Sequence, residues 1–274
     1  LYFIFLAFTA FLVVFPDLNS IVMSKVTGHI YSTGRLSLER LNPIGVGNLG
    51  NIIFLPSYWA LLNPAFISKF NFNKFFLKSV LLINLIFGLV LIIGSASRGP
   101  ISGFIITILL LELMHQKLNS YSFLKKIGIL FSFIFIIIIR FSNSFQIWNL
   151  LRIFSNALNM GDLSSKGRIS IYLEGINNFK LNPFFGKGID VNHNIIVESF
   201  NSGGLFLGII MILLIIISFR KSILIIKNRD SLAWIGVLFF PLLIQSMVSG
   251  AIYLYVELWA TIGALASIQN YSIN

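Results

Sequence analysis

The sequence predicts an all-α integral membrane protein with about eight transmembrane helices. Of its 274 residues, 57% are hydrophobic and 11% are charged, whereas soluble domains are roughly 45–50% apolar and about 25% charged. The mean hydropathy is +0.90. The apolar residues are close in number to the ~160 that eight spans of ~20 residues would need. These values exclude a water-soluble enzyme, a secreted disulfide scaffold and a disordered chain.

Long apolar runs place the predicted spans near 1–15, 46–67, 79–96, 99–114, 127–140, 194–219, 231–249 and 251–268. The fifth run is the shortest, with only ~20 Å of continuous apolar helix. The first run opens the chain without a Met or a basic stretch, so it lacks the pattern of a signal peptide. We therefore expect this sequence to be the end of a longer protein with further spans.

Basic residues predict the orientation of these spans. The short loops 69–78, 115–126 and 220–230 carry half of the Lys and Arg residues, and short basic loops stay in the cytoplasm. The two long loops, 16–45 and 141–193, then face outward from a single polytopic domain that covers 1–274. Because the charge of +11 lies between apolar runs, we expect membrane lipids and phosphorylated lipids as partners, and no nucleic acid.

The larger outward loop contains a predicted amphipathic helix. Ile169, Tyr172, Ile176 and Phe179 recur at helical spacing, which is typical of a helix lying on a membrane surface. The following LNPFFGKG segment predicts a turn, because Pro and Gly do not continue a helix.

Arg98 lies in the sequence GSASRGPISG, between two predicted spans with almost no loop. Pro100 fits the first position of the next helix, where a missing N–H is harmless. The free N–H groups of that helix and the arginine together predict an anion site. The alternative is an arginine that reaches lipid phosphates at the interface.

His193 and Asn194 stand at the outward start of the sixth predicted span. Asn is a good helix cap, and His is the side chain that exchanges protons near neutral pH without special perturbation. We consider His193 a candidate catalytic residue, with a purely structural histidine as the alternative.

The outward loops also hold Arg35 and Arg168, each after a Gly. They are candidate anion ligands, or ordinary surface arginines in weak ion pairs such as Arg168 with Glu174. Glu198 and Glu257 lie near the outer ends of predicted spans. Since acids in a membrane are usually paired or functional, we expect at least one of them to pair with an arginine.

Several kinds of site are missing from the sequence. The chain has no Cys, which excludes disulfides and thiolate ligands. It also has no D-x-D, H-E-x-x-H, G-x-S-x-G or Walker A motif. We therefore expect no metal, no cofactor and no nucleotide-dependent chemistry in the cytoplasm.

Four segments in order resemble the O-antigen ligase/polymerase family of bacterial envelope glycosyltransferases. They are GRLSLERLNPIGVG, LIIGSASRGP, GRISIYLEGINNFKLNPFFGKG and the HN pair at a span start. The resemblance covers roughly residues 35–204, and members of the family typically have more than eight spans. It implies a glycan donor carried on undecaprenyl diphosphate at the outer face of the bacterial inner membrane, and transfer to a sugar hydroxyl without nucleotide or metal.

The resemblance also implies roles for residues. Outward arginines would bind the diphosphate and the histidine would assist the acceptor hydroxyl, which gives Arg98, Arg168 and His193 as the catalytic set. The predicted substrate-binding residues are Arg35, Arg40, Asn194 and Glu198. Independently of any family, arginine offers a permanently charged fork for phosphate oxygens.

Three functions remain open at this stage. The first is a polymerase that uses a second lipid-linked repeat unit as the acceptor, and the second is a ligase that uses lipid A–core. The third is a polysaccharide flippase, which would be expected to carry charges deep within its spans. Here the charges lie in loops and at span ends, which favours chemistry at the membrane interface. Other polysaccharide assembly proteins are further candidate partners.

Overall fold

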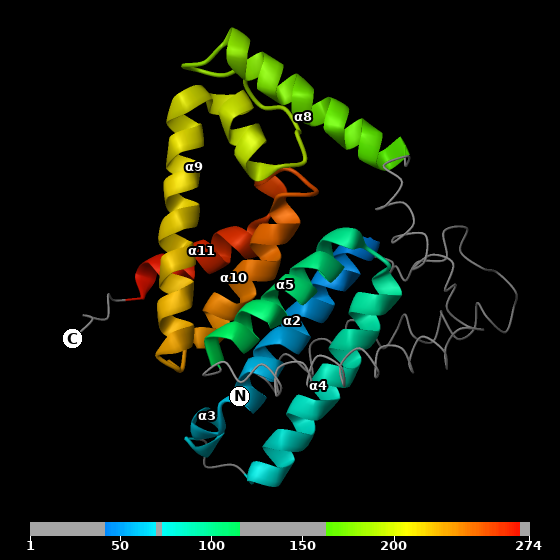
Figure 1. The fold of residues 1–274 in the computed structure, drawn as a ribbon, viewed down its shortest axis with the longest axis vertical. Helices are drawn as coiled ribbons and strands as arrows, with labels where there is room; N and C mark the ends of the chain where they lie inside the picture. The colour runs from blue at the N-terminus through cyan, green and yellow to red at the C-terminus, as the bar shows by residue number, and fades with distance from the viewer. Residues whose placement is uncertain (1–41, 70–72, 116–162, 269–274) are drawn as a thin grey trace, which may run out of the picture. The chain divides into compact units, whose positions relative to one another are not determined.

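The computed structural model describes residues 42–69, 73–115 and 163–268. Within these ranges the chain forms eight α-helices and one 3-10 helix, and no strand occurs (Figure 1). The predicted all-α class is thereby confirmed for the described residues. The predicted spans 1–15 and 127–140 lie outside them, as do almost all of the first outward loop and the first part of the second. The chain divides into two compact units, Leu1–Leu158 and Asn159–Asn274.

In the described part of the first unit three long helices lie side by side, α2 (Pro43–Leu62), α4 (Lys74–Ser95) and α5 (Arg98–His115) (Figure 1). Helices α2 and α4 approach each other closely, since a Cβ on Gly50 would lie 2.7 Å from the carbonyl oxygen of Gly88. Small residues that let two backbones meet are typical of helix packing in membranes.

The predicted span 46–67 is wrong at both ends. Helix α2 begins at Pro43, capped by the Asn42 side chain, which accepts a hydrogen bond from the Gly45 N–H over 2.8 Å. It ends before Asn63 (φ −117°, ψ 79°), and the five-residue helix α3 (Pro64–Ser68) follows. The break has a local cause, because a residue that precedes Pro is disfavoured in the α conformation.

The spans predicted at 79–96 and 99–114 are present as α4 and α5, both long and apolar enough to cross a membrane. Ala96 ends α4 in the left-handed conformation with φ 43°, and α5 begins two residues later. Pro100 is the third residue of α5 rather than the first. Its missing N–H still does no harm there, since the first four N–H groups of a helix have no intrahelical partner.

The second unit is organised around α9 (Ile195–Lys227), which contacts α8 (Leu163–Leu181), α10 (Ala233–Ser246) and α11 (Val256–Ser267). Helix α9 is kinked at Gly203 and Gly204, whose backbone angles are not helical. The kink separates a short first arm, 195–202, from a long second arm, 205–227. At 1.5 Å per residue the long arm spans about 34 Å, enough to cross a hydrocarbon core of about 30 Å.

These helices correct two predictions about the second unit. The sixth span was expected at 194–219, but helix α9 is broken by the kink at Gly203 and Gly204, and its second arm continues to Lys227. Most of the predicted cytoplasmic loop 220–230 is therefore helix. Lys221 lies within α9 and donates from Nζ to the carbonyl oxygens of Leu265, Ala266 and Ile268 over 3.1 Å each. A cation at a helix C-terminus is favourable, so this lysine holds the end of α11.

The last two predicted spans, 231–249 and 251–268, are shorter than expected. Helix α10 has 14 residues and α11 has 12. Between them the chain forms a loop with a single 3-10 turn, Ile252–Leu254. Gly250 in this loop has φ +88°, a conformation that interrupts a helix and that glycine adopts readily.

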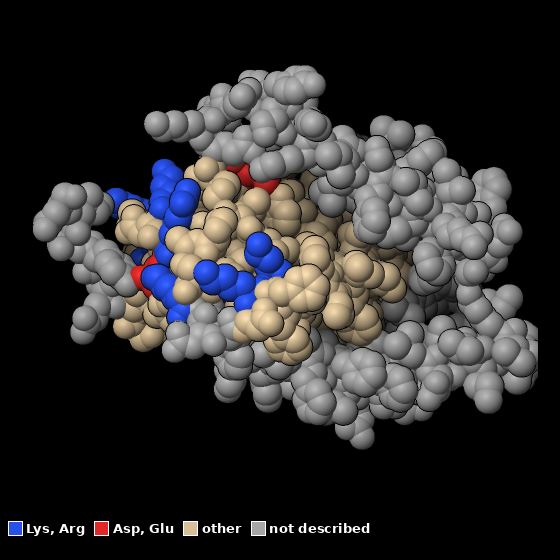
Figure 2. Space-filling view, turned by 90° about the horizontal axis from the view of Figure 1, so that it is seen from below, with Lys and Arg blue, Asp and Glu red and all other residues tan. Residues whose placement is uncertain are grey.

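In each unit, basic side chains lie at the helix ends opposite the candidate site residues. The reference residue is Arg98 in the first unit and His193 in the second. In the first unit Lys69, Lys74 and Lys78 lie around the start of α4. In the second unit Lys227 ends the long arm of α9 and Arg229 follows it. Figure 2 shows exposed Lys and Arg side chains in blue on the face seen from below. The assignment of these ends to the cytoplasm stays a prediction.

Candidate functional site

The loop between α10 and α11, residues 247–255, is the meeting point of the candidate residues in the second unit. Its carbonyl oxygens accept hydrogen bonds from side chains of α8 and of the segment that precedes α9. One of its N–H groups donates to a side chain of α9 itself. The sequence does not indicate this loop, because residues 247–255, MVSGAIYLY, are mostly apolar and join two predicted spans.

Arg168 lies in the N-terminal part of α8 and is half-buried. Its Nη1 donates to the carbonyl oxygen of Val248 over 2.9 Å, and within the described residues this is its one hydrogen bond. A guanidinium carries five N–H donors in a fixed plane. The bond to Val248 therefore uses one of these donors and fixes the direction of the plane.

His193 precedes α9 in an unusual backbone conformation, with φ +56°. Positive φ is uncommon for residues other than glycine, although His, Asn and Asp adopt it more often than most. Two contacts hold it there. Its Nδ1 lies 3.3 Å from the carbonyl oxygen of Gly250, and its own carbonyl oxygen accepts a hydrogen bond from the Tyr172 hydroxyl over 3.3 Å.

The contact with Gly250 decides which ring nitrogen of His193 can act as a base. A backbone carbonyl can only accept a hydrogen bond, so Nδ1 must carry the proton. In the neutral imidazole Nε2 then has the free lone pair. A base whose second nitrogen is held by the protein is the arrangement expected of a general base.

Asn194 is the N-cap of α9, as the sequence predicted. Its Oδ1 accepts hydrogen bonds from the N–H groups of Ile196 (3.0 Å) and Val197 (3.1 Å). Its Nδ2 donates to the carbonyl oxygen of Met247 over 2.9 Å. Both polar ends of the side chain are therefore used within the protein, to start the helix and to hold the 247–255 loop.

Glu198 is 2% exposed and acts on the same loop from one turn further along α9. Its Oε1 accepts a hydrogen bond from the Ile252 N–H over 3.0 Å, so the partner shown is a backbone amide and not the arginine expected from the sequence. Its Oε2 is buried without a partner among the described residues. Glu257, the other acid expected to pair, is exposed in the first turn of α11.

Two asparagines that the sequence analysis did not single out join α8 to α9. Asn192 donates from Nδ2 to the carbonyl oxygen of Ile171 over 3.2 Å. Its Oδ1 accepts from Nδ2 of Asn201 over 2.7 Å. Both are buried, at 1% and 0% exposed. This network fixes the segment that carries His193 and Asn194 between the two helices.

Two tyrosines complete the surroundings of the loop. The Tyr172 hydroxyl also lies 3.4 Å from the Met247 carbonyl oxygen, and the Tyr255 hydroxyl lies 3.5 Å from that of Gln245. Burial raises the pKa of both phenols, against a smaller opposing effect of Arg168. Both are therefore neutral hydrogen-bond donors at physiological pH.

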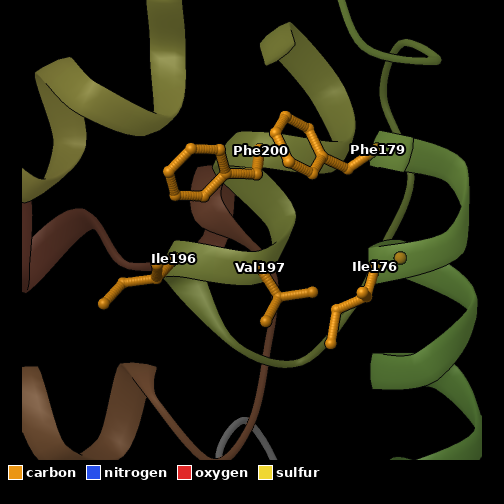
Figure 3. Close-up of a pocket in the computed structure, with 6 residues that line it drawn as sticks. Ile176, Phe179, Ile196, Val197 and Phe200 are labelled. Carbon is orange, nitrogen blue, oxygen red and sulfur yellow. The ribbon is translucent and has the colours of Figure 1, made fainter. Parts of the chain in front are cut away.

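An apolar pocket of about 140 Å³ lies on the other side of the first arm of α9, between this arm and α8 (Figure 3). Its lining residues are Gly175, Ile176, Phe179, Ile196, Val197 and Phe200. The rings of Phe179 and Phe200 meet edge to face, with centroids 5.1 Å apart. The first arm thus has a polar face toward the 247–255 loop and an apolar face toward α8. The helix predicted in the larger outward loop is present as α8, but it is not amphipathic as expected: its apolar residues do not gather on one face, and Ile169 and Ile176 are exposed.

Arg98 belongs to the other compact unit. It is half-buried and is the first residue of α5, so it lies at the N-terminal end of that helix. Asn51 of α2 donates from Nδ2 to the carbonyl oxygen of Pro100 over 2.9 Å, which fixes the first turn of α5. The structure thus brings Arg168, His193, Asn194 and Glu198 to one loop. Arg35 and Arg40 lie outside the described residues.

Comparison with known proteins identifies part of the chain. Residues 83–202 match the family model described as O-antigen ligase; no curated protein and no solved structure matches the chain. The matched range contains Arg98, Arg168, His193, Asn194 and Glu198. The resemblance drawn from the sequence is thereby confirmed over this range, and the long apolar helices agree with the expected multi-pass membrane protein.

Proposed function

We propose that this chain, whose residues 83–202 match the family model described as O-antigen ligase, is a membrane glycosyltransferase that polymerises lipid-linked oligosaccharide repeat units. The donor would be a glycan on undecaprenyl diphosphate at the outer face of the inner membrane. The acceptor would be a hydroxyl of a second lipid-linked repeat. The observation that carries this proposal is the attachment of a permanent cation, Arg168, and a base, His193, to the same loop.

Arg168 is suited to the leaving group of this reaction. Breaking the bond between sugar and diphosphate leaves negative charge on phosphate oxygens, which needs no acid if fixed positive charge meets it. Arginine binds such oxygens through two parallel N–H groups. Charge that is already in place can contribute several kcal/mol to the transition state.

His193 is suited to the acceptor. The acceptor hydroxyl must lose its proton as it attacks the sugar carbon, and Nε2 of His193 has the free lone pair because Nδ1 is held by Gly250. General base catalysis of this kind contributes about 10²–10⁴-fold. Asn194 and Glu198 support the base indirectly, through the loop that fixes it.

Arg98, Arg35 and Arg40 are proposed as further ligands of the anionic part of the substrate. For Arg98 the supporting observation is its place at the N-terminus of α5, where an anion is favoured by the helix dipole. For Arg35 and Arg40 the support is the resemblance of the first loop alone. No step of the proposed reaction needs a metal or a cofactor.

The second candidate is an O-antigen ligase, which the description of the matched family favours. It differs from the polymerase only in the acceptor, lipid A–core instead of a lipid-linked repeat. Gel analysis of envelope polysaccharide from a strain lacking the gene separates the two. Lipopolysaccharide with a single repeat supports the polymerase, full-length polymer left on the lipid carrier supports the ligase, and an unchanged pattern contradicts both.

A further inference from the structure

The segment 181–189, which is the last residue of α8 and the loop after it and is called the 181–189 loop below, exposes an unusual set of apolar side chains. Leu181 is 78% exposed, Phe184 61%, Phe185 85% and Ile189 91%. Single exposed apolar residues are ordinary, but a contiguous group of large ones usually marks a surface that meets a protein or a membrane.

The backbone of this loop is fixed against the kink of α9. The N–H of Lys187 donates to the carbonyl oxygen of Asn201 over 2.7 Å, and the N–H of Gly188 to that of Ser202 over 3.3 Å. Gly186 and Gly204 have φ +69° and +62°, and a Cβ on Gly204 would lie 2.3 Å from the Phe184 carbonyl oxygen. The two segments therefore pack backbone to backbone, and the exposed apolar side chains are presented by a rigid support.

One hydrogen bond fixes the level of the loop along α9. The N–H of Leu205 donates to the carbonyl oxygen of Pro183 over 2.8 Å. Leu205 is the first residue of the long arm, the part of α9 that is long and apolar enough to cross a membrane. Figure 1 shows the end of α8 and the start of this arm meeting at the kink. The loop therefore lies beside the first turn of the long arm, at the level where an arm that crosses a membrane would enter the bilayer. Phe206 in this turn is a further large apolar side chain, 70% exposed.

The charges on the loop fit the same environment. Lys180 and Lys187 are exposed, and cations next to apolar side chains are attracted to anionic headgroups. The one acid, Asp190, is turned to the protein: Oδ1 accepts from the Val191 N–H over 2.9 Å and Oδ2 from Asn201 over 3.4 Å.

We propose that the 181–189 loop inserts into the outer part of the lipid bilayer, with its apolar side chains in the boundary between headgroups and acyl chains. Lys180 and Lys187 then face lipid phosphates. The insertion is independent of the reaction proposed above. Its consequence is mechanical, because the loop holds the end of α8 and the kink of α9 at a fixed depth.

The absence of native Cys allows a direct test in the full chain. Phe185→Cys, Phe206→Cys and Asn177→Cys each receive a nitroxide label, and each protein is reconstituted into phosphatidylethanolamine vesicles with a minority of phosphatidylglycerol. Phe206 serves as the lipid-facing reference. Asn177, exposed on α8, serves as the aqueous reference. Power saturation compares collisions with oxygen, which concentrates in lipid, and with a polar nickel complex, which stays in water.

Insertion predicts that the label at 185 favours oxygen over nickel, as the label at 206 does, while the label at 177 favours nickel. A label at 185 with the same preference as that at 177 overturns the proposal, because the loop is then in water. A label at 185 shielded from both reagents also overturns it, because protein then covers the loop. Since Phe185 is largely exposed, the substitution removes no core contact.

Discussion

Arg168 and His193 bind carbonyl oxygens two residues apart in one loop. Arg168 Nη1 donates to Val248 over 2.9 Å, and Nδ1 of His193 lies 3.3 Å from Gly250. The two side chains come from different segments, the start of α8 and the residue before the cap of α9. The loop that follows α10 is therefore the part of the second unit that sets the position of both, and its disturbance should affect both at once.

Gly250→Ala tests this dependence. Gly250 has φ +88°, and a Cβ there would lie 2.4 Å from the Tyr255 hydroxyl oxygen, so the loop must shift. We expect a loss of stability of about 1–3 kcal/mol together with loss of transfer activity, measured by thermal unfolding in detergent and by turnover of a lipid-linked donor. Gly263→Ala is the matched control, because nothing lies within 4 Å of its Cβ position. Full transfer activity of Gly250→Ala would show that the 247–255 loop does not position Arg168 and His193 for the reaction.

Arg168→Lys should lower transfer although the charge is kept. An ammonium group cannot reproduce the planar pair of donors that a diphosphate binds. Loss of one charge-assisted hydrogen bond, worth about 1.5–3 kcal/mol, corresponds to about 10- to 100-fold in rate. The same reasoning applies to Arg98→Lys. Arg220→Lys is the control, since Arg220 is exposed toward the other end of α9. If Arg168→Lys and Arg98→Lys both make near wild-type amounts of polymer, these arginines only bind lipid headgroups and do not bind the diphosphate in the reaction.

The sequence predicts the helical class and the candidate side chains better than it predicts the contacts that position those side chains. Composition and apolar runs identify α4 and α5, because a membrane demands long apolar helices. The same signal hides the kink at Gly203 and Gly204, since an apolar run stays apolar across a break. It also merges the 247–255 loop with the spans on either side.

The hydrogen bonds of the candidate site could not be predicted from the sequence for a different reason. Arg168 and Val248 are 80 residues apart in the chain, and periodicity describes neighbours on one helix only. Glu198 shows the consequence: the sequence indicates that a buried acid needs a partner, but not that the partner is the Ile252 N–H. A Gly between a Ser and an Ala, at 249–251, was the one local sign of the loop.

Glu198 should act through structure and not through charge. Glu198→Gln keeps an oxygen that can accept from the Ile252 N–H, so we expect near wild-type stability. Glu198→Ala leaves that N–H without its partner, which costs about 1–3 kcal/mol for a buried donor, seen as a lower midpoint of thermal unfolding. Glu257→Ala, at an exposed position, should change the midpoint little. Loss of transfer in a stable Glu198→Gln would instead assign the carboxylate to the chemistry.

The orientation can be tested by labelling single cysteines in intact spheroplasts with a membrane-impermeant maleimide. Asn177 and Asn228 are both exposed and lie at opposite ends of the long arm of α9. We expect Asn177→Cys to react in intact cells and Asn228→Cys only after lysis. Asn192 is unsuitable despite its place in the predicted outward loop, because it is buried and bonded. The reverse pattern would place His193 on the cytoplasmic side and contradict the proposed function.

His193 gives the sharpest prediction, because its backbone and its ring can be tested separately. Because His193 has φ +56°, His193→Ala strains the backbone as well as removing the imidazole. Loss of activity in this variant therefore does not separate the two effects. Asn adopts positive φ more readily than most residues, and its amide can donate to the Gly250 carbonyl oxygen as Nδ1 does. It has no basic nitrogen to take up a proton.

We therefore expect His193→Asn to retain the unfolding midpoint of the wild type while transfer falls about 10²–10⁴-fold. The measurement uses purified protein with lipid-linked donor and acceptor, and donor binding is checked separately, since Arg168 is unchanged. His193→Gly serves as the comparison in which the backbone is relaxed and the ring is also absent. Turnover by His193→Asn close to that of the wild type would show that the residue holds the loop and takes no part in proton transfer.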